Sequence, residues 1–278
     1  MDAKLAKRRR IRNPVGAGMF YPEDRSEMLE YIQSFGMEEG RGGYAKAIIA
    51  PHGAWTYSGE LVASAFSAAM GRSDSIKRIV ILGPIHDKRE KGLFLSNSHY
   101  FHTPLGNIPV DQEITEELLF ISNHFEINDI PHLGEHSIEI LLPFVKYCFP
   151  HASIVPILMG QPGAGYIYDL SQALKTVFSH ILDDTLFVVS CNLSCDTDQS
   201  KALDSARQCL HLFSRKDTSA LASAILDGRL NACGGALVVS LLDSGLLDNT
   251  QAVFSADNMV SAVGVEKNIV YYSEVSFE

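Results

Sequence analysis

The chain of 278 residues lacks long apolar runs, and no stretch reaches the ~18 consecutive apolar residues that a membrane-spanning helix needs. It also lacks an excess of positive charge, because 23 Lys and Arg stand against 33 Asp and Glu, for a formal net charge of −10. A net acidic chain is poorly suited to bind nucleic acids or anionic membranes in general. We therefore expect neither as a partner.

Cysteine is sparse, with five residues in the whole chain. This odd number, together with a basic N-terminus that no apolar stretch follows, gives no sign of export and predicts reduced thiols in the cytoplasm. Cys148 and Cys209 lie in amphipathic helical patterns, so we expect them to pack as small core residues.

Linkers, repeats and low-complexity segments are also missing from the sequence. Nothing in the composition marks a domain boundary, and α/β domains of roughly 250 residues are common as single units. We expect a basic tail over residues 1–12 and a single α/β domain over residues 13–278. The tail is predicted to be solvated, with a local anion contact as the alternative, and its cations are Lys4, Lys7, Arg8, Arg9, Arg10 and Arg12.

Short β-branched runs alternate with amphipathic segments along the rest of the chain. Runs of Ile and Val closed by Gly or Pro are typical of strands buried in a parallel sheet. They predict strands over 46–50, 78–82, 153–159 and 185–190, the third at an edge or bulged because it contains Pro156. Helices are expected over 24–35, 58–70 (with Ser58 as N-cap), 111–123, 137–149, 167–182, 201–213, 220–226 and 232–242, a hairpin-like excursion over 91–109, and one or two final strands over 253–277. This alternation predicts a three-layer α/β/α domain with a mostly parallel central sheet.

Two of the predicted strands are each followed by a histidine within two residues of a proline. His52 follows the first strand, and His86 follows the second. Ligands of open α/β sheets bind beyond the carboxyl ends of the strands, so both imidazoles are expected at this rim. Paired imidazoles on rigid turns predict a metal site, and the alternative is that each ring is a hydrogen-bonded structural residue.

Four segments of the chain carry a family resemblance. They are Ala17-Gly18-Met19-Phe20-Tyr21-Pro22, Pro51-His52-Gly53, Gly83-Pro84-Ile85-His86 and Gly134-Glu135-His136-Ser137-Ile138-Glu139. Their order and spacing, from about Arg12 to the end of the chain, resemble the Memo family, whose bacterial members are often called AmmeMemoRadiSam system protein B. The resemblance implies a fold similar to that of class III extradiol dioxygenases and, by family association, a companion radical-SAM protein.

The resemblance also implies a small pocket at the strand ends, in which two histidines and a cysteine hold a metal. His52 and His86 match the histidines, and Cys233 matches the cysteine. Cys233 stands just before a predicted helix, a position that favours the thiolate, which is the ligating and nucleophilic form. Iron is implied first, and copper and zinc suit the same two imidazoles and thiolate.

The sequence departs from the family pattern around this pocket. Asn192 and Cys195 replace a carboxylate and a histidine, while Asp87 replaces a second histidine. Trp55 stands where the family has tyrosine, and we expect it to line the pocket with these three residues and Glu135. Asn192 cannot act as a general base.

Two of these replacements have alternative interpretations. Cys195 is either an inert buried thiol or a fourth ligand that closes a tetrahedral zinc site. Asp87 either restores a negative charge to the pocket or is a solvated loop acid.

His136, between Glu135 and Glu139, is expected to exchange a proton at the pocket, with a purely structural role as the alternative. We assign catalytic roles to His136 and Cys233. No role is assigned to the remaining histidines, which are His99, His102, His124, His132, His151, His180 and His211.

Three functions remain open from the sequence. The first is metal binding with redox or dioxygenase-like chemistry on a small substrate, although ring cleavage normally uses two histidines and a carboxylate. The second is a non-catalytic binding or scaffold protein, whose vestigial pocket takes a small molecule or a peptide. The third is metal-free nucleophilic chemistry by Cys233, with His136 or His52 as the base.

Overall fold

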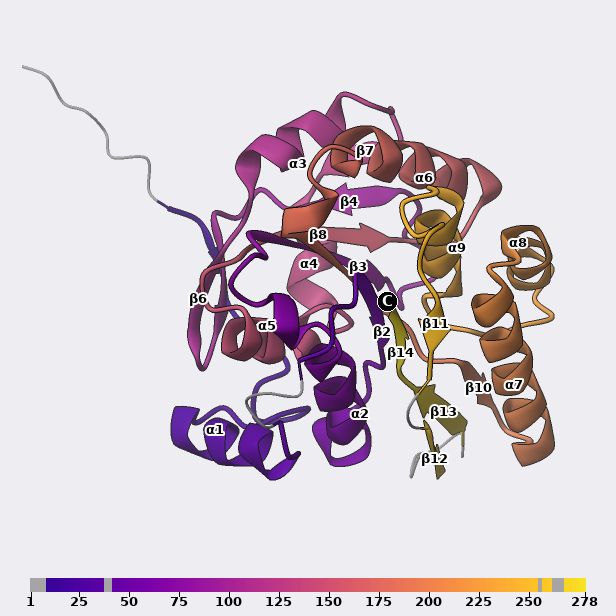
Figure 1. The fold of residues 1–278 in the computed structure, drawn as a ribbon, viewed down its shortest axis with the longest axis horizontal. Helices are drawn as coiled ribbons and strands as arrows, with labels where there is room; N and C mark the ends of the chain where they lie inside the picture. The colour runs from indigo at the N-terminus through magenta and orange to yellow at the C-terminus, as the bar shows by residue number, and fades with distance from the viewer. Residues whose placement is uncertain (1–8, 38–41, 255–256, 262–267) are drawn as a thin grey trace, which may run out of the picture.

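The computed structural model describes residues 9–37, 42–254, 257–261 and 268–278, and its central element is an eight-stranded sheet (Figure 1). From edge to edge, the strands are β11 (Ala252–Val253), β14 (Val275–Phe277), β2 (Ala47–Ala50), β9 (Thr185–Ser190), β3 (Arg78–Pro84), β8 (Ser153–Met159), β4 (Leu93–Leu95) and β7 (Phe125–Ile127). The pairs β2–β9, β9–β3, β3–β8 and β4–β7 are parallel. The other three pairs are antiparallel, so the prediction of a mostly parallel sheet is confirmed.

The central strands are buried on both faces, and their alternate side chains enter two separate cores. Ile48 and Val188 enter one core, whereas Ile49 and Val189 enter the other. The first core is covered by α1 (Arg25–Ser34), α2 (Trp55–Ser67) and α5 (Leu142–Cys148). The second is covered by α3 (Gln112–Leu119), α6 (Ala164–Phe178), α7 (Gln199–Arg215), α8 (Thr218–Leu226) and α9 (Gly235–Asp243). The predicted three-layer α/β/α arrangement is therefore confirmed, as Figure 1 shows.

Two small sheets flank the main one. The first contains β1 (Ile11–Arg12), β5 (Tyr100–Thr103) and β6 (Gly106–Pro109), and the second contains β10 (Ser194–Asp196), β13 (Ile269–Ser273) and β12 (Asp257–Ser261). The predicted excursion over 91–109 holds the β5–β6 hairpin, but β4 leaves it to join the main sheet. The end of the chain forms more strands than the one or two predicted, because β12 and β13 pair in the small sheet while β11 and β14 extend the large one.

The prediction that β8 is an edge or bulged strand was wrong. The strand pairs with β3 without interruption from Ser153 to Met159, and it pairs with β4 on its other side. Pro156 has no N–H to donate, but the pairing with β4 begins only at Ile157. The proline therefore falls just outside that ladder, where a missing donor costs little.

Two predicted helices begin elsewhere. The helix α2 begins at Trp55, so Ser58 lies inside it, where its hydroxyl donates to the carbonyl oxygen of Gly53 instead of capping the helix. The segment over 137–149 forms a 3₁₀ turn at Glu139–Leu141 before α5 begins at Leu142. The short α4 (Asp129–Gly134) and two further 3₁₀ turns (Met70–Arg72 and Leu182–Asp184) complete the elements.

The N-terminal tail is shorter than the sequence indicates. Arg9 and Arg10 are exposed, but Arg12 is only 2% exposed and belongs to β1. Lys4, Lys7 and Arg8 lie outside the described residues.

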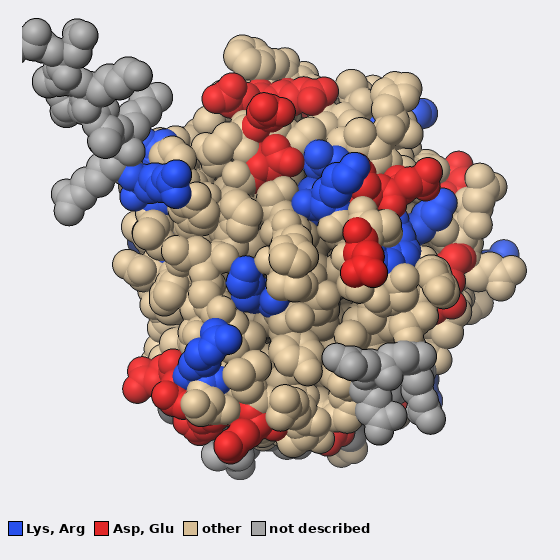
Figure 2. All heavy atoms as spheres, turned by 60° about the vertical axis from the view of Figure 1, so that its left-hand side comes forward, with Lys and Arg blue, Asp and Glu red and all other residues tan. Residues whose placement is uncertain are grey.

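The charged side chains form small separate groups on the face shown in Figure 2, with wide uncharged areas between them. Among the described residues, no helix is long and apolar enough to cross a membrane.

Candidate metal centre

Three central strands of the sheet bring the candidate site together at their carboxyl ends. The strand β2 leads into His52 and β3 leads into His86, while β9 lies between them, pairs with both and ends at Ser190. Because these strands are parallel, their carboxyl ends lie on the same side of the sheet, and the residues that follow them meet on that side. The turn before α9 adds Cys233, which is fixed to this side by a bridge to Asn192.

His52, His86 and Cys233 form a compact group, in which the candidate ligand atoms all lie within 4.8 Å of one another. The ring centroids of the two histidines are 5.2 Å apart, and Nε2 of His86 is 3.3 Å from Sγ of Cys233. The fold therefore collects the three residues that the sequence proposes as ligands. Two imidazoles and a thiolate could hold iron, copper or zinc.

His52 is held in a form that leaves one ring nitrogen without a partner. Its Nδ1 is 2.8 Å from Oγ of Ser190, and that hydroxyl donates its only hydrogen to the carbonyl oxygen of Ser137 at 2.7 Å. Nδ1 must therefore donate to Ser190, which leaves Nε2 unprotonated in the neutral ring. Burial holds the pKa of His52 well below its usual value, and repulsion from the nearby ring of His86 adds to this effect.

The Nε2 atom of His52 is buried, and it has no hydrogen-bond partner within the part of the chain that the structure describes. A buried acceptor left in this state is destabilising. An unprotonated nitrogen with a free lone pair is also what a metal ion requires of histidine. The centre therefore fits a metal by its donor set and by this orphaned atom.

His86 is oriented by the carboxylate of Glu135. Oε2 accepts from the backbone N–H of His86 at 2.8 Å, and Oε1 lies 3.0 Å from Nδ1 of its ring. Burial opposes the charged ring, but hydrogen bonds to Cys233 and Glu135 outweigh it and raise the pKa of His86 to about 10. Burial likewise opposes ionised Glu135, but its bonds to His86 lower its pKa to about 2. Such carboxylate–histidine pairs are typical of metal ligands.

His136 stacks between two rings beside the centre. Its centroid is 4.7 Å from that of Phe20 and 4.8 Å from that of His86. Burial and the charge of His86 lower its pKa. His86, Glu135 and His136 are a second group that could hold a metal, but Glu135 already accepts from four donors, including the N–H groups of His136 and Ser137. We therefore interpret this group as support for His86.

The residues that depart from the family pattern lie in different places. Asn192 lies at the centre, where its Oδ1 accepts from the backbone N–H of His52 at 3.0 Å. Cys195 lines the neighbouring cavity, but it is not part of the ligand group. The described residues thus do not assemble the four-ligand zinc site that the sequence left open.

Asp87 and Trp55 are not part of the centre. Asp87 forms an exposed ion pair with Arg89, whose hydrogen bonds lower the pKa of Asp87 to about 2. Trp55 is 1% exposed, donates from Nε1 to the carbonyl oxygen of Ile140 at 3.1 Å, and packs against Phe144. The solvated-acid alternative therefore describes Asp87, and Trp55 is a core residue because its helix turns the ring into the α2–α5 layer.

A cavity of about 1010 Å³ opens beside the centre. His86, Cys233, Asn192 and Cys195 belong to its wall. A molecule in this cavity would reach the centre from the side of His86 and Cys233, whereas His52 lies buried behind them. The arrangement suits a bound ion with positions open to a ligand.

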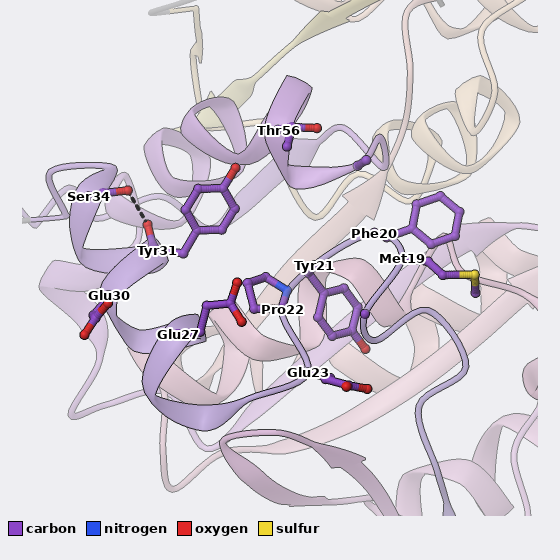
Figure 3. Close-up of a pocket in the computed structure, with 12 residues that line it drawn as sticks. Met19, Phe20, Tyr21, Pro22, Glu23, Glu27, Glu30, Tyr31, Ser34 and Thr56 are labelled. Carbon is purple, nitrogen blue, oxygen red and sulfur yellow. Dashed lines mark hydrogen bonds between the residues drawn. The ribbon is translucent and has the colours of Figure 1, made fainter. Parts of the chain in front are cut away.

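A second cavity, of about 650 Å³, lies against α1 (Figure 3). Glu27 and Tyr31 of α1 line it together with the segment 18–23. Phe20 belongs to its wall and also stacks on His136, so this cavity adjoins the centre through one ring.

Sequence reasoning missed the residues that support the ligands. Ser190 is a polar residue at the end of a buried strand, and that position was the only signal for it. Arg12 and Glu139 form a buried ion pair, in which Glu139 also accepts from Gly16 N–H and Tyr21 Oη, both at 2.6 Å. This pair fixes the N-terminal segment over the loop that carries Glu135 and His136. A separation of 127 residues conceals it in the sequence.

The fold and the site define a class: a three-layer α/β protein with a candidate metal centre of two histidines and a cysteine at the strand ends. The family model described as "Memo-like protein" matches residues 12–264, and the chain belongs to this family.

Individual relatives extend this result. The MEMO1 family protein of Thermotoga neapolitana is 30% identical over 247 residues, which are 84% of this chain and 88% of that protein. The MEMO1 family protein of Methanobrevibacter smithii is 26% identical over 282 residues, covering 96% of this chain and all of the other. Among solved structures, uncharacterized protein JW3007 from Escherichia coli K12 has a TM-score of 0.44 at 11% identity, covering 84% of this chain and 99% of that one. The predicted likeness to class III extradiol dioxygenases stays a prediction.

Proposed function

We propose that this protein binds a redox-active metal ion, iron or copper, through His52, His86 and Cys233, and presents it to a small molecule in the large cavity. The observation that carries the proposal is the buried and unprotonated Nε2 of His52, which has no partner among the described residues and lies beside the other two donors. When bound, such an ion supplies electron-transfer chemistry that side chains alone do not. The companion radical-SAM protein stays a prediction from family association.

The chain's own residues have separate roles in this proposal. Glu135 and Ser190 fix the orientation of the two ligand rings through Nδ1. Asn192 holds the backbone of His52 and adds no charge. His136 is neutral near pH 7 because its pKa is lowered, so its ring can accept a proton from a molecule bound at the centre.

The test is the metal content of anaerobically purified protein. Wild type is compared with His52→Ala, Cys233→Ala and the control His124→Ala, which removes a histidine that pairs with Asp169 away from the centre. We expect nearly one iron or copper per chain in wild type and control, and none in the two centre variants. Zinc in the wild type that is also lost from a Cys195→Ala variant would favour a closed structural site. A wild type without metal after reconstitution would favour the scaffold hypothesis with a vestigial pocket.

A second candidate function is metal-free nucleophilic chemistry. It is favoured by the line of contacts from Sγ of Cys233 to Nε2 of His86 at 3.3 Å and from Nδ1 of His86 to Glu135 at 3.0 Å. A nucleophile, a base and an orienting carboxylate in this order are the arrangement of a catalytic triad. The contact of His86 with the sulfur supports His86 as the base in this candidate, in place of His136 or His52, which the sequence had suggested.

Alkylation separates the two candidates. Metal-free protein treated with iodoacetamide near neutral pH should be modified at Cys233 faster than at Cys195, and His86→Ala should slow this reaction. A Cys233 thiol that reacts no faster than Cys195 would remove the nucleophile hypothesis and leave the metal proposal intact.

A further inference from the structure

The large cavity beside the centre has a second polar wall, which α7 forms. Lys201, Ser205 and Gln208 of this helix line the cavity, at the spacing i, i+4 and i+7. Residues at this spacing lie on one face of a helix. The same cavity therefore contacts His86 and Cys233 on one wall and a row of three hydrogen-bond donors on another.

The donors on this face are not used by the protein itself. Within the described part of the chain, the side chains of Lys201 and Gln208 form no hydrogen bond or ion pair, and Oγ of Ser205 is buried without a partner. Two other polar residues of the wall are engaged: Asn231 donates to the carbonyl oxygen of Cys195 at 2.7 Å, and Arg229 pairs with Asp227 at 3.3 Å. Lys88 and Gln161 also line the cavity, and their side chains form no hydrogen bond or ion pair with the described residues. The α7 face differs from the rest of the wall because three such donors lie together on it at helical spacing.

The Ser205 hydroxyl shares its lack of a hydrogen-bond partner with one other buried side-chain atom of the described residues. Among the side chains that the structure describes, only Nε2 of His52 and Oγ of Ser205 are buried nitrogen or oxygen atoms without a partner. The first belongs to the metal centre and the second to a residue that lines the cavity beside it. Buried polar groups are normally satisfied, so the unpartnered hydroxyl of a residue in this wall indicates that a group from outside the protein completes it.

The charges of the wall restrict what such a group can be. Lys201 and Lys88 are cations without a protein partner among the described residues, and Asp204 and Asp196 are the acids of the same wall. A lysine, a hydroxyl and an amide all donate, so they suit an oxygen acceptor that carries negative charge. Arg229 is the third cation of the wall, but it is paired with Asp227. The two carboxylates offset the charge of the two lysines, so the wall suits a single negative charge better than a dianionic phosphate.

Apolar side chains complete the lining, among them Ile85, Met159, Leu230 and Val270. They suit a hydrocarbon body of a ligand. We propose that the cavity takes a small carboxylate-bearing substrate, whose body extends toward His86 and Cys233. Lys201 and Gln208 hold its carboxylate, and the Ser205 hydroxyl turns from its buried position to donate to it as well. The role of the metal in acting on this substrate rests on the proposed function, but the carboxylate site does not require the metal.

The test uses probes with a matched six-carbon chain: hexanoate, hexanamide and hexyl phosphate. Their affinities for the full chain are measured by ligand-observed NMR, with and without metal. We expect hexanoate to bind at least about fivefold more tightly than hexanamide, because its bonds to the lysine are charge-assisted. Lys201→Met should abolish this preference, Ser205→Ala should weaken it, and Lys201→Arg should retain part of it. The control Lys175→Met removes an exposed lysine of α6 and should change nothing.

Three results would overturn the proposal: equal binding of hexanoate and hexanamide (including no binding of either), tighter binding of hexyl phosphate, or a carboxylate preference that survives Lys201→Met. The metal-free arm keeps this test separate from the metal proposal. A carboxylate preference in protein that never takes up metal would support the anion site while contradicting the proposed function. Stoichiometric metal without any carboxylate preference would support the proposed function and contradict the anion site.

Discussion

At the scale of single residues, the centre depends on groups that hold its ligands rather than on the ligands alone. His52 and His86 each use Nδ1 for a hydrogen bond to a protein oxygen, and Nε2 is the nitrogen near the other donors. The two supports differ in charge, since Ser190 is a neutral hydroxyl and Glu135 is an ionised carboxylate. Burial keeps the ring of His52 neutral, whereas hydrogen bonds to Cys233 and Glu135 keep the ring of His86 charged in the metal-free protein.

Ser190→Ala tests this support. Without the hydroxyl, Nδ1 of His52 loses its acceptor, and the preference for the form with unprotonated Nε2 is lost. We expect the metal affinity to fall about 10–100-fold, the usual effect of removing such a partner. Chelator competition measures the affinity, and nitrogen NMR of the metal-free protein reports the protonation of the two ring nitrogens.

The matched control for that variant is Ser171→Ala, which removes another buried hydroxyl, on α6, that donates to the carbonyl oxygen of Tyr168. It should leave both readouts unchanged. A Ser190→Ala protein with wild-type affinity and an unchanged ring would show that packing alone fixes His52.

At the scale of elements, the start of α9 positions Cys233. Gly234 has φ of +99°, and a Cβ atom there would lie 2.2 Å from the carbonyl oxygen of Ser190. A side chain would therefore have to push the turn away from the end of β9. This close approach explains why glycine stands between Cys233 and the helix.

Gly234→Ala should lower both stability and metal content, and Gly228→Ala provides the comparison. Gly228 has φ of +70° but no atom within 4 Å of an added Cβ, so its replacement meets only backbone strain, about 1 kcal/mol. The loss at Gly234 should be larger, because backbone atoms must also move. Urea unfolding and metal analysis of both variants check this, and equal losses would contradict the steric explanation.

The Arg12–Glu139 pair attaches β1 and the following segment to the loop of Glu135. Both side chains are almost completely buried. Glu139→Gln would leave the Arg12 guanidinium buried without a counter-charge, which should lower the free energy of unfolding by about 3–5 kcal/mol. Urea unfolding measures the loss, and the double variant Arg12→Met with Glu139→Gln should recover part of it. A Glu139→Gln protein as stable as wild type would show that the pair is not needed.

At the scale of the whole molecule, acid stability depends on buried neutral histidines. Burial lowers the pKa of His132 from 6.5 to about 4, although its ring bonds to the carbonyl oxygen of Phe94 at 3.1 Å. Between pH 6.5 and pH 4, His132 is therefore largely protonated in the unfolded chain and largely neutral in the folded chain. Its contribution to stability is present above pH 6.5 and is lost as the pH falls toward 4.

Between pH 7 and pH 5 this single group should remove about 2 kcal/mol of unfolding free energy. His132→Gln keeps a donor for Phe94 but cannot take up the proton, so its stability should change less over the same interval. The exposed His211 is the control, and His211→Gln should behave as wild type. Urea unfolding measures the free energy of unfolding of the three proteins at both pH values. An identical pH dependence in all three would contradict the role of His132 in acid stability.

The sequence by itself determined the layers of this protein and the identity of its candidate ligands. The β-branched runs of β2, β3, β8 and β9 and the amphipathic segments between them are local patterns, and local periodicity shows which faces are buried. His52 and His86 could be placed at one rim because parallel strands end at the same edge. Cys233 came from family resemblance, and the fold brings it to the same rim.

Only the tertiary structure decided how the site is supported and what surrounds it. The order of strands placed β9 between β2 and β3, and so brought Ser190 against His52. The Arg12–Glu139 pair and the α7 wall of the cavity join segments far apart in the chain. These contacts depend on strand order and helix packing, which local patterns do not encode, so Ser190 and Ser205 looked like ordinary serines until the chain was folded.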